Sequence, residues 1–211
     1  MSPASTVGLR DGRTALLRPL EPDDGERLQQ AFERLSPTSR YRRFLRPMHE
    51  ISDTDLHYLL SIDHRDHEAI LALDPVQDEA VGVARFVRLQ AGARSAEAAV
   101  AVVDDWQGQG LGRALLERLS ERAREEGIDH FTAVAQAENR RAIEALGALG
   151  PTTASYEGSL VELDIELAPA GLSGALAAAL RAAAGSLLDP RPLYDRILHR
   201  ARELYVRRAG Q

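Results

Sequence analysis

Residues 100–116 constrain the fold of this chain more than any other segment. An apolar strand is followed by a four-residue break, by glycines at positions 108, 110 and 112, and by a helix with a regular apolar face. Glycine lets backbone N–H groups turn inward and come close to a ligand. The helix adds its own unpaired N–H groups and the positive end of its dipole. The segment therefore predicts a strand–loop–helix unit that binds an anion, typically a phosphate or pyrophosphate.

Length and composition indicate one folded domain with room for an appendage. The chain has 211 residues, of which 44% are hydrophobic, enough to bury a core. It has no cysteine, which excludes disulfides, thiolate catalysis and cysteine-bound metals. Neither a secretory signal nor a membrane-spanning stretch is visible, so we expect a cytoplasmic protein without a membrane partner.

The composition changes after residue 168, and we place a domain boundary there. Residues 1–168 are expected to form the main domain, and residues 169–211 a helical C-terminal extension. The last part, residues 191–211, has six arginines and two acids, a local net charge of +4. Packing of its apolar stripe on the domain is one expectation, and a homodimer through these helices is another. The whole chain carries a net charge of −6, so we expect no nucleic-acid partner.

Hydrophobic periodicity predicts an α/β (α+β) domain with a mixed, mostly antiparallel central sheet flanked by helices. Two short strands are expected around a turn within residues 7–18. Further strands are expected over residues 68–73, 81–89, 96–103, 130–135, 152–156 and 160–167. Helices are expected from residue 22 and over residues 38–45, 53–60, 110–126 and 139–149.

The glycine spacing separates this loop from two common phosphate-binding loops. The dinucleotide fingerprint needs Gly-x-Gly-x-x-Gly, and the third glycine here comes one residue early. The nucleoside-triphosphate loop needs a lysine, whereas all 26 basic residues of this chain are arginines. A dinucleotide-binding oxidoreductase is therefore only a weak alternative.

Residues 107–112 resemble the signature of the Gcn5-related N-acetyltransferases (GNAT), in which Gln or Arg is followed by x-x-Gly-x-Gly/Ala. Residues 137–142 are similar to the Glu-Asn-x-x-Ala segment that opens the next helix in that family. The resemblance covers about residues 7–167. It implies the GNAT acyltransferase fold, with acetyl-CoA as co-substrate and no metal.

The same resemblance implies a set of coenzyme-binding residues. The loop would hold the pyrophosphate of acetyl-CoA, and the pantetheine arm would bind the end of the preceding strand like an extra strand. Asn139 would contact the coenzyme. The expected coenzyme-binding residues are Val100, Ala101, Val102, Gln107, Gly108, Gln109, Gly110, Leu111, Gly112, Arg113, Asn139 and Ala142.

A closer resemblance is to bacterial protein lysine acetyltransferases that are often fused to a cyclic-nucleotide-binding domain. It rests on residues 67–72 and 81–87 and on Glu97, ten residues before Gln107. No cyclic-nucleotide-binding domain accompanies these residues, so that regulation is not carried over. The resemblance implies an amine acceptor, with a protein lysine and a small molecule both open.

Glu97 is the candidate general base, because it is an acidic residue within an otherwise apolar strand. Strand alternation places it on one face with Ala99, Ala101 and Val103. The small alanines leave space for a substrate or a chain of water molecules. In the related lysine acetyltransferases the matching glutamate is the base. The alternative is a charge at a strand edge that faces solvent.

The other catalytic roles are less defined. A backbone N–H near Val102 is expected to hold the oxyanion, where the strand must separate from its neighbour. Many relatives have a tyrosine seven residues after the Asn139 position as acid for the leaving thiolate, and this chain has Leu146. Either the thiolate leaves unassisted or another group such as Tyr156 helps. The second hypothesis for function is a non-catalytic module that senses acetyl-CoA, which Leu146 favours and Glu97 opposes.

Two polar clusters have competing interpretations. Zinc binding is conceivable for five neighbouring polar residues, but their spacing is not His-Glu-x-x-His, which favours a polar loop before a strand. These residues are His57, His64, Asp66, His67 and Glu68. The arginines of residues 41–44 either line the acceptor groove or lie on a helix surface.

Overall fold

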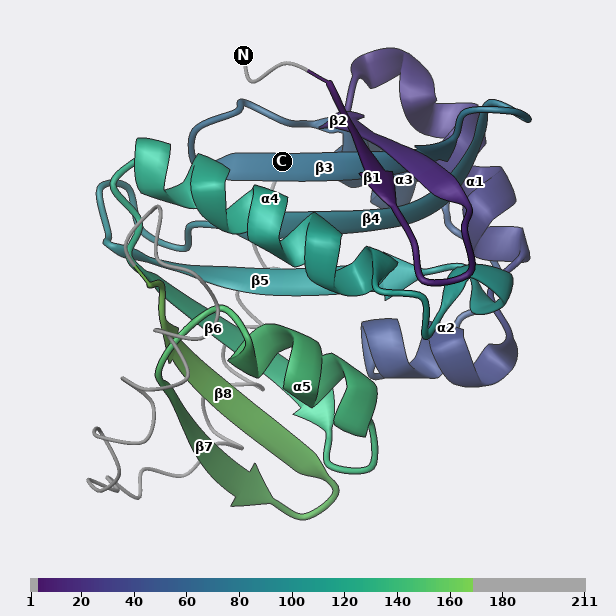
Figure 1. The fold of residues 1–211 in the computed structure, drawn as a ribbon. Helices are drawn as coiled ribbons and strands as arrows, with labels where there is room; N and C mark the ends of the chain where they lie inside the picture. The colour runs from purple at the N-terminus through teal and green to yellow at the C-terminus, as the bar shows by residue number, and fades with distance from the viewer. Residues whose placement is uncertain (1–3, 169–211) are drawn as a thin grey trace.

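The computed structural model describes residues 4–168. An eight-stranded sheet forms its centre, with the strand order β1-β2-β3-β4-β5-β6-β8-β7 (Figure 1). Neighbouring strands are antiparallel except for β5 and β6, which are parallel. The predicted mixed, mostly antiparallel sheet is therefore confirmed. The predicted helical extension over residues 169–211, and any pairing of two copies through it, lies outside the described residues.

The elements follow the predicted ones with shifts of a few residues at their ends. The strands are β1 Ser5–Gly8, β2 Thr14–Pro19, β3 His67–Asp74, β4 Glu79–Val87, β5 Ser95–Val102, β6 His130–Gln136, β7 Thr152–Glu157 and β8 Leu160–Glu166. The helices are η1 Pro22–Asp24, α1 Gly25–Glu33, α2 Pro37–Phe44, α3 Asp53–Leu60, η2 Asp104–Trp106, α4 Leu111–Glu125 and α5 Arg140–Gly147. No helix of the described part is long and apolar enough to cross a membrane.

Helices cover both faces of the sheet. Helices α4 and α5 lie on one face, and α1, α2 and α3 lie on the other (Figure 1). Strand β3 shows how alternation serves both layers, because Ile70 and Ala72 join the core under α4 while Ala69 and Leu71 join the core under α1. The two layers leave the central strand β3 buried on both sides.

Helix α4 forms as its sequence pattern predicts. Its apolar stripe is fully buried and consists of Leu111, Leu115, Leu119 and Ala123. The helix begins after Gly110, which has φ +97°, and ends before Gly127, which has φ +75°. Both conformations lie in the left-handed region that glycine adopts without strain. Gly82 in β4 lets the helix pack closely, because a Cβ there would lie 3.0 Å from Leu115 Cδ1.

The parallel pair β5 and β6 diverges, and this divergence creates the site. Pairing is confined to Ser95–Glu97 on β5 and His130–Thr132 on β6. Beyond it, β6 pairs with β8 on its other side, and among residues 4–168 the rest of β5 pairs only with β4. One edge of β5 is thus open at its C-terminal end, directly before the glycine loop.

Candidate active site

The open edge of β5 presents backbone N–H groups from alternate residues. The Val103 N–H donates to the Val81 carbonyl in β4 at 3.0 Å. Because successive residues along a strand direct their backbone groups to opposite sides, Val100 and Val102 face the gap. Within residues 4–168, no strand pairs with this edge there. An extended ligand chain can therefore add to β5 at Val100 and Val102 as a further strand would, whereas Ala101, also expected to bind the coenzyme, directs its backbone groups toward Val83 in β4.

The glycine loop has the conformation that an anion-binding loop needs. Gly108 has φ +76° and Gly110 has φ +97°, values that L side chains rarely adopt. A Cβ on Gly110 would meet no atom within 4 Å, so the loop is open on that side. The first backbone N–H groups of α4, from Leu111 onward, follow directly and have no partner within the helix. Gly112 instead faces β5, where its Cβ would lie 3.6 Å from Val102 Cγ2.

Gln107 connects the glycine loop to β5 and α2 through hydrogen bonds. Its amide Nε2 donates to the Val102 carbonyl at 2.9 Å and contacts Ser39 Oγ and Asp104 Oδ1, both at 3.2 Å. Asp104 also accepts from the Ser36 N–H at 2.6 Å and from the Ser39 hydroxyl. Burial opposes the ionisation of Asp104, but hydrogen bonds from Ser39 and Ser36 outweigh it and lower its pKa. The network ties the start of α2 to the loop, and the sequence analysis missed it.

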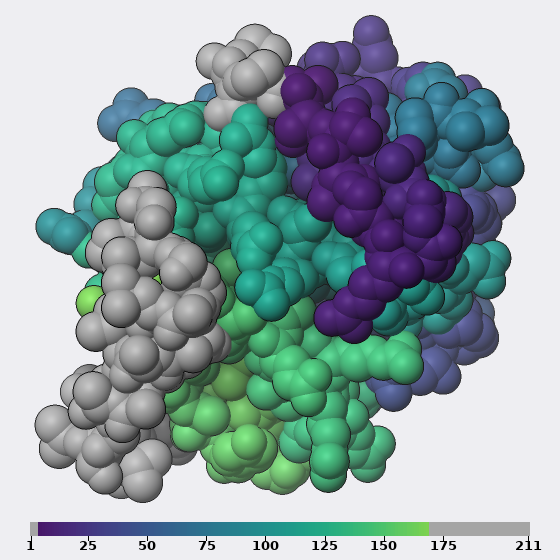
Figure 2. Space-filling model, viewed as in Figure 1, coloured from purple at the N-terminus to yellow at the C-terminus, as the bar shows by residue number. Residues whose placement is uncertain are grey.

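The turn between β1 and β2 also contacts the glycine loop. The Arg10 N–H donates to the Gln109 carbonyl at 3.1 Å. Arg13 donates to the Asp105 carbonyl at 2.8 Å, and its guanidinium lies 4.0 Å from the centre of the Trp106 ring. Figure 2 shows the N-terminal segment, in purple, on the same face of the molecule as α4. The start of α2, the end of β5 and the turn between β1 and β2 therefore all contact the loop region and hold it in place.

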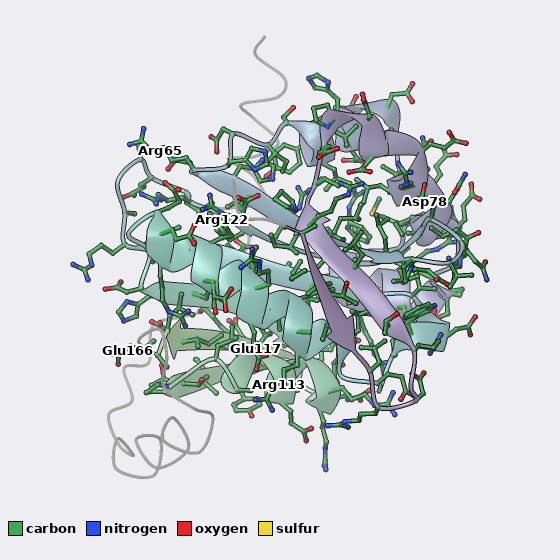
Figure 3. All side chains as sticks on the ribbon, turned by 45° about the horizontal axis from the view of Figure 1, so that its top comes forward. Arg65, Asp78, Arg113, Glu117, Arg122 and Glu166 are labelled. Carbon is green, nitrogen blue, oxygen red and sulfur yellow. The ribbon has the colours of Figure 1, made fainter. Side chains whose placement is uncertain are left out.

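Arg141 lies against the glycine loop, a contact that the sequence analysis missed. It lies in the first turn of α5, and a Cβ built on Gly108 would lie 3.7 Å from its Nη1. A cation thus lies against the loop that is expected to hold the pyrophosphate. Asn139 caps the same helix, with its Oδ1 accepting from the Ala142 N–H at 3.4 Å. Arg113, in contrast, is paired with Glu117 at 2.7 Å on the exposed face of α4 (Figure 3).

Glu97 lines a cavity on the face of the sheet opposite α4. The cavity has a volume of about 220 Å³ and lies between β4, β5 and the α2–α3 region. An adjoining cavity of about 60 Å³ reaches Ala101 and Val103. The predicted face of Glu97, Ala99, Ala101 and Val103 is therefore confirmed. The larger cavity is lined by Arg43, Phe44, Met48, Ile51, Asp55, Tyr58, Leu59, Arg85, Val87, Leu89, Glu97 and Ala99.

A buried arginine and histidine lie next to each other beside this cavity. Arg85 and His67 are 6% and 8% exposed. The Arg85 guanidinium is 2.9 Å from His67 Nε2 and donates to the Leu59 carbonyl at 2.7 Å. Arginine has no acceptor, so His67 must accept through Nε2 and is neutral. Burial and the charge of Arg85 accordingly lower the pKa of His67 to about 4, and burial lowers that of Arg85 to about 9.

The low pKa of His67 makes the stability of the fold depend on pH. Below pH 6.5 the unfolded chain binds a proton at His67, whereas the folded chain binds it only below about pH 4. Stability is therefore expected to fall as the pH decreases from 6.5 to 4, by about 3 kcal/mol, with no further loss from this group at lower pH. Urea unfolding at pH 7.5 and 4.5 measures it. The variant His67→Gln, which keeps an acceptor and cannot titrate, should lose correspondingly less; an equal loss in both proteins would contradict the prediction.

Three other members of the histidine cluster form ion pairs. Glu68 is fully buried between His64, at 2.9 Å, and Arg122, at 3.0 Å. Asp66 pairs with Arg88 at 3.3 Å. Within the part of the chain that the structure describes, no group of three His, Cys, Asp or Glu side chains is placed to hold a metal.

Neither Leu146 nor Tyr156 is placed to donate a proton to the leaving thiolate at the open edge of β5. Leu146 is 4% exposed and belongs to the hydrophobic core. Tyr156 is 66% exposed on β7, the outermost strand, with β8 and β6 between it and β5. It is therefore not brought near the open edge of β5.

Comparisons with known proteins agree with this geometry. Residues 28–150 match the profile described as "Acetyltransferase (GNAT) family". Acetyltransferase PA5475 of Pseudomonas aeruginosa is 38% identical over 144 residues, which cover 67% of this chain and 77% of that protein. Acetyltransferase Pat of Mycolicibacterium smegmatis is 29% identical over 163 residues, 77% of this chain and 49% of that protein. The crystal structure of the GNAT domain of S. lividans PAT matches with a TM-score of 0.72 and 34% identity, covering 79% of this chain and all of that one.

These matches include the glycine loop, residues 137–142 and the segments around Glu97 on which the sequence resemblance rested. The family profile spans the cavity face, the open edge of β5 and the loop together. The chain belongs to the GNAT family and is an acetyl-CoA-dependent N-acetyltransferase.

Proposed function

We propose that this protein transfers the acetyl group of acetyl-CoA directly to a primary amine, with Glu97 as the general base. One observation carries the proposal: Glu97 faces a cavity from the strand whose open edge leads into the glycine loop. A coenzyme bound at that loop and edge would place its thioester beside the same strand. The acceptor would then enter from the cavity.

The proposed step uses groups on β5. The amine nitrogen bonds to the thioester carbonyl carbon, the carbon–sulfur bond breaks, and the amine proton passes to the Glu97 carboxylate. The N–H groups of Val100 or Val102 point into the gap, where they would stabilise negative charge on the carbonyl oxygen. No acyl-enzyme through cysteine is available, because the chain has none.

The leaving thiolate is proposed to depart without a tyrosine acid. Leu146 supplies no proton, and Tyr156 lies two strands beyond β6. A thiol has a pKa near 8.5, so its anion is a tolerable leaving group near neutral pH. The Glu97 proton can then return to solvent or to the departing sulfur.

The test is acceptor labelling. Thiol release from acetyl-CoA is measured with amino acids, polyamines and lysine peptides, and mass spectrometry checks that the acceptor gains one acetyl group. The chain has no lysine, so acetylation of its own side-chain amines adds no background. Binding of acetyl-CoA without turnover across the whole panel would support the sensor hypothesis instead.

Arg141 is proposed to contact the phosphates of the coenzyme. Arg141→Ala is expected to raise the KM for acetyl-CoA about tenfold and to change kcat little, because a charge-assisted hydrogen bond to phosphate is lost. Initial rates at varied acetyl-CoA measure both constants. Arg94→Ala is the control, since Arg94 is an exposed arginine paired with Asp129 at the other end of β5. Equal KM values in the two variants would remove Arg141 from this role.

A further inference from the structure

The cavity beside Glu97 contains two guanidinium groups that the proposed reaction does not use. Arg43 enters from α2 and Arg85 from β4. Arg43 packs on the Phe44 ring at 5.0 Å, but within residues 4–168 it has no hydrogen bond or ion pair. Burial lowers its pKa, against the opposing effect of Glu97 and Tyr58. A half-buried guanidinium without a bonded partner is a group that an anion would satisfy.

The second guanidinium is fixed in place. Each of its terminal nitrogens has a partner, His67 Nε2 for Nη1 and the Leu59 carbonyl for Nη2. In the sheet register Arg85 is opposite Ala99, and Glu97 is opposite Val87. Arg85 and Glu97 are therefore diagonal neighbours on one face, a relation that typically separates their side-chain origins by about 7–8 Å. The base and the cation lie close enough for one small molecule to contact both.

Two acids line the same cavity, and one of them has partners of its own. Asp55 also lines the wall, but it accepts from the Ser52 hydroxyl at 2.7 Å and lies 3.7 Å from the exposed Arg46. Glu97 is the other carboxylate, and its proposed task is to receive the acceptor proton. A protonated lysine side chain would bring one more cation to this site and no anion.

We infer that the acceptor is an α-amino acid, whose carboxylate binds Arg43 and Arg85 while its amine faces Glu97. The inference rests on the proposed function and specifies its substrate class. The acetyl group moves from sulfur to the α-nitrogen, whose proton passes to Glu97 while coenzyme A leaves as the thiolate. Apolar walls from Met48, Ile51 and Leu89 favour an aliphatic or thioether side chain. The volume of about 220 Å³ is below the roughly 300–1,000 Å³ of pockets for drug-sized ligands, which fits a compact acceptor.

The experiment compares each acceptor with its amide. L-leucine, L-valine and L-methionine, their amides, and Nα-acetyl-L-lysinamide are assayed by thiol release with the full chain at saturating acetyl-CoA. An amide has the more easily deprotonated α-amine, so chemistry alone favours it. We expect kcat/KM to be at least about tenfold higher for one of the free amino acids than for its amide. In Arg43→Gln the preference should fall to within about threefold, with kcat/KM for the amide nearly unchanged.

Arg65→Gln is the matched control, because it removes the same charge from an exposed position before β3 that does not line the cavity. It should keep the preference. Turnover of the amides or of the lysine analogue at equal or higher kcat/KM would leave the proposed function standing and overturn the amino-acid inference.

If no amine is acetylated, the proposed function fails, and the amino-acid inference is then tested by binding, measured by calorimetry. With coenzyme A present, wild type is titrated with each amino acid and each amide. Carboxylate-dependent binding that Arg43→Gln abolishes would support the anion site, and equal or absent binding of both forms would overturn it.

Discussion

Replacing Glu97 with glutamine is expected to lower kcat about 10²–10⁴-fold, the usual contribution of a positioned general base. Glutamine keeps the size and polarity of the side chain but cannot accept the amine proton. The KM for acetyl-CoA should change little, because the loop and the open edge of β5 are proposed to bind the coenzyme through backbone groups that the substitution leaves in place. Steady-state rates with the best acceptor of the panel, together with a thermal unfolding curve, measure the effect.

The control for this experiment is Glu166→Gln, an exposed glutamate on β8 (Figure 3). It removes the same charge from a strand outside the cavity and should leave kcat within about twofold of wild type. At high pH the acceptor loses its proton to solvent, so the deficit of Glu97→Gln should shrink as the pH rises. A kcat within twofold of wild type at neutral pH would exclude Glu97 as the base.

Substituting Gly150 with alanine is expected to destabilise the protein by at least about 3 kcal/mol or to prevent folding. A Cβ at this position would lie 1.9 Å from the Glu166 carbonyl oxygen and 3.1 Å from the Ala168 nitrogen. Both atoms belong to the backbone, so no side-chain rotation relieves the overlap. The Glu166 N–H bonds to the Pro151 carbonyl and the Ala168 N–H to the Leu149 carbonyl, and a shift would disturb both bonds.

Gly147→Ala is the control for the same methyl group three residues earlier. Its Cβ would meet only Thr152 Oγ1, at 3.9 Å, which is ordinary contact. Because Gly147 is the last residue of α5, alanine there should be neutral or slightly stabilising. Urea unfolding of both variants provides the comparison, and similar unfolding midpoints would show that the chain accommodates the methyl group at Gly150.

Local sequence patterns predicted the elements that form the coenzyme site. The stripe of α4 has the helical period, its glycines lie where the backbone needs φ above zero, and β5 is an alternating apolar strand. All three signals depend on residues within a few positions of one another. They were enough to place Glu97 on one face with Ala99, whereas the open strand edge before the loop was implied by the family resemblance.

The partners that complete the site come from distant parts of the sequence. Gln107 reaches Ser39, 68 positions away, and Arg13 reaches the Asp105 carbonyl, 92 positions away. Arg141 lies against Gly108 only because α5 packs beside α4. No periodicity or turn preference encodes such pairings, because they depend on the order of strands in the sheet and on which helices cover each face.

The sequence by itself determined the strand, the glycine loop, the helix and a carboxylate ten residues upstream, because backbone conformation and side-chain alternation are local properties. Only the tertiary structure decided the surroundings of that carboxylate. Strand register brought Arg85 diagonal to Glu97, and the packing of α2 brought Arg43 into the same cavity. The donor end of the site therefore follows from the sequence pattern, whereas the charge of the acceptor cavity follows from how the sheet and its helices pack.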